Sequence, residues 1–327
     1  MSAPPKISIV MAVYDGAAQI RRALASLRGQ SFADWELLIV DDASRDDTGP
    51  LAERFAADDP RVRVHRLSRN VGPGSARNTG LAAARGEWIT VLDGDDAYEP
   101  DRLRVLIDRA VSDDLDVVAD NLTLYDETTA QSLGPAFGLA GEHCALTPHR
   151  LVENDCPPRM IVPGQLKPFV RRAFLVATGV RYPEDIRVGE DFQFLFDLLE
   201  RTDRAVLLSY CGYRYTLPFS PDRGRQSSGT RTSHGASGLA DLVSGTQRLI
   251  ERTARRERPD RRLVALLERR RRRLRDEDIW RRARAHMRAR GYFAAACLLA
   301  RVDPLFGWAQ AVGIFNRRRG RIRAVLR

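Results

Sequence analysis

Cysteine and histidine are both scarce in this 327-residue chain, and neither forms a pattern typical of a metal site. No two of the four cysteines have CxxC spacing, and the five histidines lack the spacing of metal ligands. The chain is also too long for a small scaffold held together by disulfides. We therefore expect reduced thiols in the core of a cytoplasmic protein, at Cys144, Cys156, Cys211 and Cys297.

Long apolar runs are missing as well. The first residues contain no basic segment followed by an apolar stretch, so we expect no signal peptide. The apolar region at 292–315 is interrupted by Arg301, Asp303 and Pro304. It therefore falls short of the about 20 apolar residues that a spanning helix needs. Hydrophobic residues still make up 43% of the chain, which is enough for a packed core.

Positive charge is concentrated at one end of the chain. The net charge is +10, yet residues 1–250 contain 29 Lys+Arg against 35 Asp+Glu, whereas residues 251–327 contain 24 against 8. The last quarter of the chain therefore carries the whole basic excess. Such asymmetry indicates a segment that meets an anionic surface, either a membrane or a nucleic acid.

The first third of the sequence alternates between short β-rich apolar runs and stretches with helical spacing. This alternation predicts βαβ units and a mostly parallel, Rossmann-like sheet flanked by helices. Ligands of such sheets bind beyond the carboxyl ends of the strands. The expected strands are 7–13, 35–40, 62–67, 88–92 and 117–119, and the expected helices are 20–27, 50–55, 75–84 and 102–111.

The rest of the chain is less regular. We expect a sheet edge with loops over 121–165, helices at 171–177 and 191–201, and a strand at 205–209. Residues 217–238 are rich in Ser, Gly, Arg and Pro, which indicates a flexible loop or a domain boundary. The sequence thus predicts a catalytic α/β domain over 1–216, the loop over 217–238, and a basic helical C-terminal extension over 239–327.

Clusters of acidic residues follow two of the expected parallel strands. Asp41 and Asp42 follow one strand, and Asp93-Gly94-Asp95-Asp96 follow another. A single Asp at such a place commonly caps the next helix. Three acids within four residues repel one another unless a cation is bound, and carboxylates suit Mg²⁺ or Mn²⁺. We expect Asp93 and Asp95 to bind the metal, with Asp96 as a third ligand, a supporting group or a helix cap.

A glycine-rich turn at 70–80 leads into an expected helix between the two acid clusters. Free N–H groups at a helix N-terminus bind anions, and Arg77 lies one turn into this helix. Gly94 would likewise let the backbone approach a phosphate closely. An ordinary loop-to-helix junction with an exposed Arg is the alternative interpretation.

Together these segments resemble family 2 glycosyltransferases, which have the GT-A fold. The similarity rests on residues 7–15 (ISIVMAVYD), 40–48 (VDDASRDDT), 70–80 (NVGPGSARNTG) and 92–96 (LDGDD), taken as a group. It implies an inverting transfer from a uridine-diphosphate sugar, with Mn²⁺ or Mg²⁺ as cofactor. Asp15 replaces the usual Asn. The residues that the resemblance assigns to the donor are Ala12, Val13, Tyr14, Asp41, Asp42, Arg77, Asp93 and Gly94, with Asp95 on the metal.

An inverting transfer also needs a base that takes the proton of the acceptor hydroxyl. The segment 188–192 (VGEDF) resembles the family's Glu-Asp motif, which favours Asp191 as the base with Glu190 in support. The alternative is that both acids merely stabilise a helix N-terminus. The candidate acceptor or loop contacts are Lys167, Arg223, Arg225 and Gln226. The QxxRW motif of processive members is absent, which favours addition of a single sugar.

The basic extension suits a peripheral contact with the inner face of the cytoplasmic membrane and a lipid-linked saccharide acceptor. Packing on the catalytic domain is the alternative. No nucleic-acid-binding module is recognisable, so we expect no nucleic-acid partner. The nearest resemblance is to bacterial exopolysaccharide transferases of the succinoglycan type. Two other functions compete with this one: a sugar nucleotidyltransferase, and a membrane-tethered nucleotide-sugar-binding protein without activity.

Overall fold

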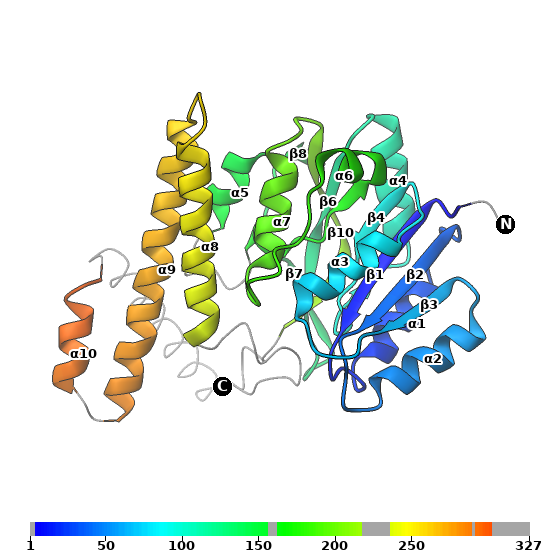
Figure 1. Ribbon diagram of the computed structural model, residues 1–327, viewed down its shortest axis with the longest axis horizontal. Helices are drawn as coiled ribbons and strands as arrows, with labels where there is room; N and C mark the ends of the chain where they lie inside the picture. The colour runs from blue at the N-terminus through cyan, green and yellow to red at the C-terminus, as the bar shows by residue number, and fades with distance from the viewer. Residues whose placement is uncertain (1–3, 156–161, 218–235, 290–291, 303–327) are drawn as a thin grey trace, which may run out of the picture. The chain divides into compact units, whose positions relative to one another are not determined.

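A computed structural model describes residues 4–155, 162–217, 236–289 and 292–302 (Figure 1). The chain divides into two compact units. The first comprises residues 1–151 and 163–233, and the second comprises 152–162 and 234–327. The candidate site lies in the first unit, whereas the Arg-rich helices belong to the second. The domain boundaries at 216 and 239 stay predictions.

One half of the sheet is parallel, as predicted. It has the strand order β3 (Val62–Arg66), β2 (Trp35–Asp41), β1 (Ile7–Val13) and β4 (Trp88–Val91), and every neighbouring pair is parallel. All residues of β2 and β4 are buried. Burial on both faces explains why these strands are almost continuously apolar.

The other half of the sheet is mixed. The short β9 (Phe169–Arg171) runs antiparallel between β4 and β6 (Val117–Asp126), and β10 (Ala205–Thr216) is parallel to β6. The edge strands are β5 (Ala97–Tyr98) and β8 (His143–Ala145), which pair with β10, and β7 (Gln131–Pro135), which pairs with β6.

Two of these strands continue well beyond their predicted ends at residues 119 and 209. In β6 the apolar run stops at Asp120 and Asn121, but both polar side chains are buried and paired inside the protein. In β10 a shift of register between Leu208 and Tyr213 interrupts the alternating pattern. The extension matters for function, because the ends of β10 and β4 meet at the candidate site.

Helices pack along this sheet (Figure 1). Apolar residues with helical spacing stabilise these helices by burying one face against the sheet. In α1 the buried residues are Ile20, Ala23, Leu24 and Leu27. The helices α1, α3 and α7 bring side chains to the site. The helices of the first unit are α1 (Ile20–Arg28), α2 (Thr48–Asp58), α3 (Pro73–Ala83), α4 (Arg102–Ser112), α6 (Arg172–Thr178) and α7 (Glu190–Leu199); α5 (Pro148–Asn154) spans the boundary between the units, and a 3-10 turn covers Pro163–Gln165.

The second unit contains α8 (Ala236–Ala254), α9 (Arg261–Arg288) and α10 (Tyr292–Leu299). The helices α8 and α9 lie side by side (Figure 1). Asp260 caps α9 by accepting a hydrogen bond of 2.9 Å from the Leu263 amide. The buried Arg270 pairs with Asp155 at 2.9 Å and also contacts Thr246.

The described residues test two expectations from the sequence, one about membrane-spanning helices and one about the cysteines. No helix among the described residues is long and apolar enough to cross a membrane. The cysteines Cys144, Cys211 and Cys297 are free, as expected, but the expectation that they pack in the core is wrong. Cys144 lies on the edge strand β8 and Cys211 within the register shift of β10, and both are half-buried, whereas Cys297 is exposed on α10. Cys156 lies outside the described residues.

Candidate active site

The acidic turn, which comprises residues 93–96, follows β4 at the carboxyl end of the parallel half of the sheet. Asp96 connects this turn to β10 through two hydrogen bonds. One oxygen of the buried Asp96 accepts a hydrogen bond of 2.7 Å from the Tyr213 hydroxyl, and the other accepts one of 2.7 Å from the Thr216 amide. The Tyr213 oxygen in turn accepts a hydrogen bond of 3.2 Å from the Asp93 amide. Asp96 is therefore a structural anchor of the turn.

Two further contacts hold the same turn from the side of α1 and β1. Arg22 donates hydrogen bonds to the backbone oxygen of Asp95 and, at 2.9 Å, to the Thr216 hydroxyl. Gly94 lies so close to β1 that a Cβ atom there would be 2.8 Å from Cγ1 of Val13. A larger residue at this position would therefore require the Val13 side chain or the turn to shift.

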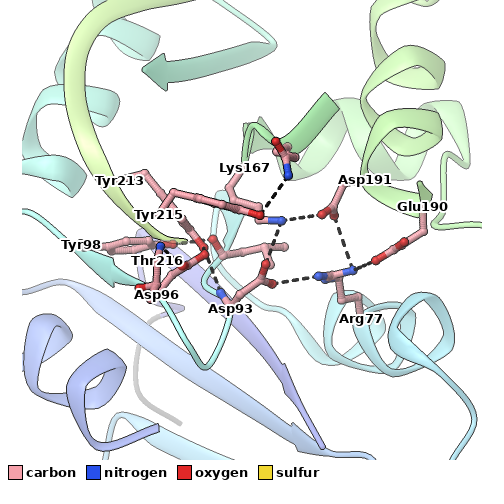
Figure 2. A network of polar contacts seen from close by, with 12 residues as sticks. Arg77, Asp93, Asp96, Tyr98, Lys167, Glu190, Asp191, Tyr213, Tyr215 and Thr216 are labelled. Carbon is pink, nitrogen blue, oxygen red and sulfur yellow. Dashed lines mark hydrogen bonds and ion pairs between the residues drawn. The ribbon is translucent and has the colours of Figure 1, made fainter. Parts of the chain in front are cut away.

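An alternating network of charges connects this turn to α3 and α7 (Figure 2). Arg77 on α3 pairs with Asp93 at 2.8 Å, with Glu190 at 2.8 Å and with Asp191 at 3.5 Å. Lys167 lies between Asp93 and Asp191, and its Nζ atom is 2.9 Å from Asp93 and 2.5 Å from Asp191. Residues that are far apart in the sequence therefore form one continuous site.

The two cations stabilise the ionised form of Asp93. Burial alone would raise the pKa of this carboxyl, but the charges of Lys167 and Arg77 hold its pKa below the ordinary value. Burial would likewise lower the pKa of Lys167, yet Asp191 and Asp93 raise it above the usual value. Both groups are therefore charged at neutral pH, and their attraction holds the network together.

In three other carboxyls of the site, burial and neighbouring acids outweigh the cations and raise the pKa. Burial, followed by the charge of Asp93, raises the pKa of Asp95 to about 6. Burial and the charges of Asp95 and Asp93 raise the pKa of Asp96. Burial and the neighbouring Asp191 also raise the pKa of Glu190. The acidic turn thus concentrates negative charge that its protein neighbours do not fully balance.

This acidic turn fits a divalent cation. Asp93, Asp95 and Asp96 offer oxygen atoms that all lie within 4.8 Å of one another. Hard oxygen ligands of this kind suit Mg²⁺ and Mn²⁺. Asp96 is engaged by β10, and Asp93 is ion-paired, whereas the half-buried Asp95 carboxylate has no ion pair among the described residues. Asp95 is therefore the best-suited ligand, with Asp93 beside it.

The carboxylate of Asp191 has one engaged oxygen and one that accepts no hydrogen bond. Lys167 holds Oδ2, whereas Oδ1 is buried, lies 3.5 Å from Arg77 as an ion pair, and has no hydrogen-bond partner in the described structure. Two other buried polar atoms in this region lack such a partner, namely Nε of Arg77 and the hydroxyl of Tyr182, whose ring stacks on Phe194 at 4.0 Å between centroids. A carboxylate oxygen with unused accepting capacity is what a general base requires.

The residues predicted to line the donor lie at the ends of β1 and β2. Tyr14 is 42% exposed and Ala12 is half-buried, whereas Val13 is buried. Asp41 is fully buried, and its carboxylate accepts hydrogen bonds from the Ser44 amide at 2.9 Å and from Arg66 at 3.2 Å. Direct contact of these residues with a donor stays a prediction.

Asp42 stabilises the glycine-rich turn before α3. Its two oxygens accept hydrogen bonds from the amides of Val71 at 2.7 Å and Gly72 at 2.9 Å. It thereby fixes the turn that precedes α3, and so fixes the position of Arg77. A Cβ atom at Gly74, in the first turn of α3, would lie 2.2 Å from the Pro183 oxygen, so this helix packs closely against the segment before α7.

The structure brings together only part of the predicted site and adds residues that sequence reasoning missed. It unites Arg77, Asp93, Lys167, Glu190 and Asp191, whereas Arg223, Arg225 and Gln226 lie outside the described residues. Arg22, Tyr182, Tyr213 and Thr216 were not predicted. The aromatic alternation of Tyr213 and Tyr215 could have indicated the end of β10, but Arg22 and Tyr182 carry no signal in the sequence.

Comparisons with known proteins give a consistent picture. Residues 8–137 match the family model described as glycosyl transferase family 2. The succinoglycan biosynthesis protein ExoO of Rhizobium meliloti is 37% identical over 216 residues, which cover 65% of this chain and 61% of that protein. The succinoglycan biosynthesis protein ExoU of the same organism is 34% identical over 239 residues, which cover 70% and 66% respectively. The chain thus spans about three fifths to two thirds of these relatives.

Solved structures share the fold at lower sequence identity. TarS of S. aureus in complex with UDP-GlcNAc has a TM-score of 0.63 at 20% identity, covering 80% of this chain and 70% of that one. The mannosyltransferase PcManGT of Pyrobaculum calidifontis, in complex with GDP-Man and Mn²⁺, has a TM-score of 0.58 at 18% identity, covering 96% and 80%. These likenesses confirm the predicted GT-A fold with its C-terminal helices.

Proposed function

The chain belongs to glycosyl transferase family 2, and on this premise we propose that it transfers one sugar from a nucleotide-sugar donor to a saccharide hydroxyl. A uridine-diphosphate sugar is the donor class that we favour, since TarS shares the fold and binds UDP-GlcNAc. The observation that carries the proposal is the network linking Asp93 to Asp191 through Lys167 and Arg77. It joins a donor-side carboxylate to a candidate base in one site.

In the proposed reaction, the acceptor oxygen attacks the anomeric carbon from the face opposite the diphosphate. The new bond forms while the bond from the anomeric carbon to the diphosphate oxygen breaks. The hydroxyl proton passes to Oδ1 of Asp191, the oxygen without a hydrogen-bond partner. The nucleoside diphosphate leaves, the anomeric configuration inverts, and no covalent intermediate with the enzyme is needed.

The remaining residues of the network position the reacting groups. Glu190 holds one side of Arg77, and Arg77 holds Asp93 and Asp191 in fixed relation. Mn²⁺ or Mg²⁺, when held by Asp95 and Asp93, supplies positive charge against the negative charge that develops on the leaving diphosphate. PcManGT, which shares the fold, is in complex with Mn²⁺.

For the acceptor we propose a lipid-linked saccharide of cell-surface glycan or exopolysaccharide assembly. Two relatives are succinoglycan biosynthesis proteins, and the helix α9 carries exposed arginines suited to anionic lipid headgroups. The protein would then act at the inner face of the cytoplasmic membrane, with the second unit as a peripheral contact. The exposed arginines of α9 include Arg261, Arg262, Arg269, Arg272 and Arg275.

A donor screen tests this function. The purified protein is incubated with Mn²⁺ or Mg²⁺, a panel of nucleotide sugars and membrane extract as the source of acceptor, and released nucleoside diphosphate is measured. We expect release from one uridine-diphosphate sugar, with loss of release in the presence of a chelator and in Asp95→Ala. Absence of turnover with every donor, despite binding of a nucleotide, would instead indicate a tethered binding protein.

A further inference from the structure

Lysine is almost absent from this chain, and one of its two lysines lies in the candidate site. Of the 53 Lys and Arg residues, only Lys6 and Lys167 are lysines. The side chain of Lys6 is 34% exposed and pairs with Glu87 at 2.5 Å, next to β1. The side chain of Lys167 is 2% exposed and is surrounded by charged groups. The buried lysine therefore needs a specific explanation.

The geometry around Lys167 favours a compact cation. Its Nζ atom lies 2.9 Å from Oδ2 of Asp93 and 2.5 Å from Oδ2 of Asp191, so a single ammonium is shared by two carboxylates. An ammonium is a point charge with three donors, whereas a guanidinium is a wide planar fork. Arg77 uses such a fork, because its two terminal nitrogens pair separately with Asp93 and Glu190, each at 2.8 Å (Figure 2).

The backbone beneath Lys167 is fixed. Arg102, which is fully buried, donates a hydrogen bond of 3.0 Å to the backbone oxygen of Lys167 and pairs with Asp120 at 2.8 Å. Removing one partner of such a buried pair is strongly unfavourable, so this support is rigid. The backbone of Lys167 is thus held in place independently of the ion pairs that its side chain makes.

The ammonium stands at the edge of the acidic turn. Asp93, Asp95 and Asp96 bring their oxygens within 4.8 Å of one another, and Lys167 supplies positive charge to the first of them. A divalent cation among these acids would lie a few ångströms from the ammonium and repel it. The two cations therefore compete for Asp93.

We propose that Lys167 is an internal counter-ion that competes with a divalent cation for Asp93, so that loading of the acidic turn changes the ion pair that holds Asp191. This inference rests on the proposed function. Before loading, Lys167 bridges both carboxylates and keeps Asp191 paired. After loading, its contact with Asp93 weakens, and its charge is directed to Asp191 and to the diphosphate. Lys167 is thus a positioning residue that connects the donor side of the site to the base.

Binding of Mn²⁺ alone tests the competition. Free Mn²⁺ is measured by electron paramagnetic resonance in wild type, Lys167→Met and the matched control Lys6→Met. We expect Lys167→Met to bind Mn²⁺ about tenfold more tightly, since even in water the repulsion of a divalent ion and an ammonium at about 5 Å is of this size. Lys6→Met should equal wild type, and Lys167→Arg, which keeps the charge, should stay closer to wild type than Lys167→Met.

Equal or weaker Mn²⁺ binding by Lys167→Met would overturn the proposal. Failure of every variant to bind Mn²⁺ would also overturn it, without touching the donor screen, which measures transfer in the presence of nucleotide sugar. Conversely, tighter Mn²⁺ binding by Lys167→Met in a protein that turns over no donor would support the counter-ion and remove the proposed function. The two ideas therefore fail separately.

A second measurement does not depend on the folding of Lys167→Met. Selective ¹³C labelling of lysine gives two side-chain Cε signals in the full chain, and Lys6→Met identifies that of Lys6. Addition of Mg²⁺, and then of UDP, should shift the signal of Lys167 and leave that of Lys6 unchanged. Two signals that both stay in place while UDP binds would contradict the proposal.

Discussion

Replacing Arg77 by Met removes the cation that three carboxylates share. The side chain of Arg77 is 7% exposed and lies within ion-pair distance of Asp93, Glu190 and Asp191. Without it, these acids would face one another with only Lys167 between them. Removing one partner of a buried ion pair costs about 3–5 kcal/mol, so we expect the first unit to lose stability of that order. The exposed Arg54, replaced by Met, should change stability by about 0.5 kcal/mol at most.

The assay must report on the first unit alone. Trp35 and Trp88 are buried in it, whereas Trp280 belongs to the second unit and Trp308 lies outside the described residues. In a Trp280→Phe, Trp308→Phe background, tryptophan fluorescence therefore follows unfolding of the sheet. A loss of this size lowers the urea midpoint by roughly 1 to 2 M.

Addition of Glu190→Gln to Arg77→Met should restore part of the lost stability, because it removes one of the unpaired charges. The reasoning would be refuted if Arg77→Met shifted the midpoint no more than Arg54→Met. It would also be refuted if the double variant were as unstable as the sum of two independent losses, because the charges would then not form one network.

Three further predictions concern the acidic turn. Because the folded pKa of Asp95 is raised to about 6, wild type loses stability as the pH rises from about 4, the ordinary value of this carboxyl, to about 6. In a chelator at pH 7.5, Asp95→Asn should therefore be more stable than wild type by about 2–3 kcal/mol, and urea unfolding should show this difference vanishing below about pH 4. Gly94→Ala should raise the KM for donor several-fold in steady-state kinetics, since a Cβ would meet Val13 at 2.8 Å. Tyr213→Phe should cost about 1–3 kcal/mol in urea unfolding, because it leaves the buried Asp96 without one hydrogen bond; no shift of the midpoint would mean that Asp96 does not anchor the turn.

The parallel half of the fold could be predicted because its signals are local. The strand Ile7–Val13 matches the prediction residue for residue, since an apolar run buried on both faces needs no distant partner to be recognised. The mixed half was harder. Buried polar residues such as Asp120 and Asn121 look like a strand end until their partners are known, and those partners are distant in the sequence.

The candidate site divides in the same way. The acids at strand ends, Arg77, and the pair at the start of α7 could be predicted from motifs. The burial of Lys167 between two carboxylates could not, because residue 167 is 74 positions from Asp93 and 24 from Asp191. A lone lysine in a loop gives no sign of its partners, and its position depends on the buried Arg102 beneath it.

The central claim is that Asp191 is the base of a sugar transfer. Its most direct test compares Asp191→Asn with the matched control Asp203→Asn, an exposed site outside the network. Donor affinity is measured by calorimetry and turnover by nucleoside-diphosphate release. We predict that Asp191→Asn binds donor nearly as wild type but loses about 10²–10⁴-fold in kcat, with Asp203→Asn unchanged. A kcat for Asp191→Asn close to that of wild type would contradict the account.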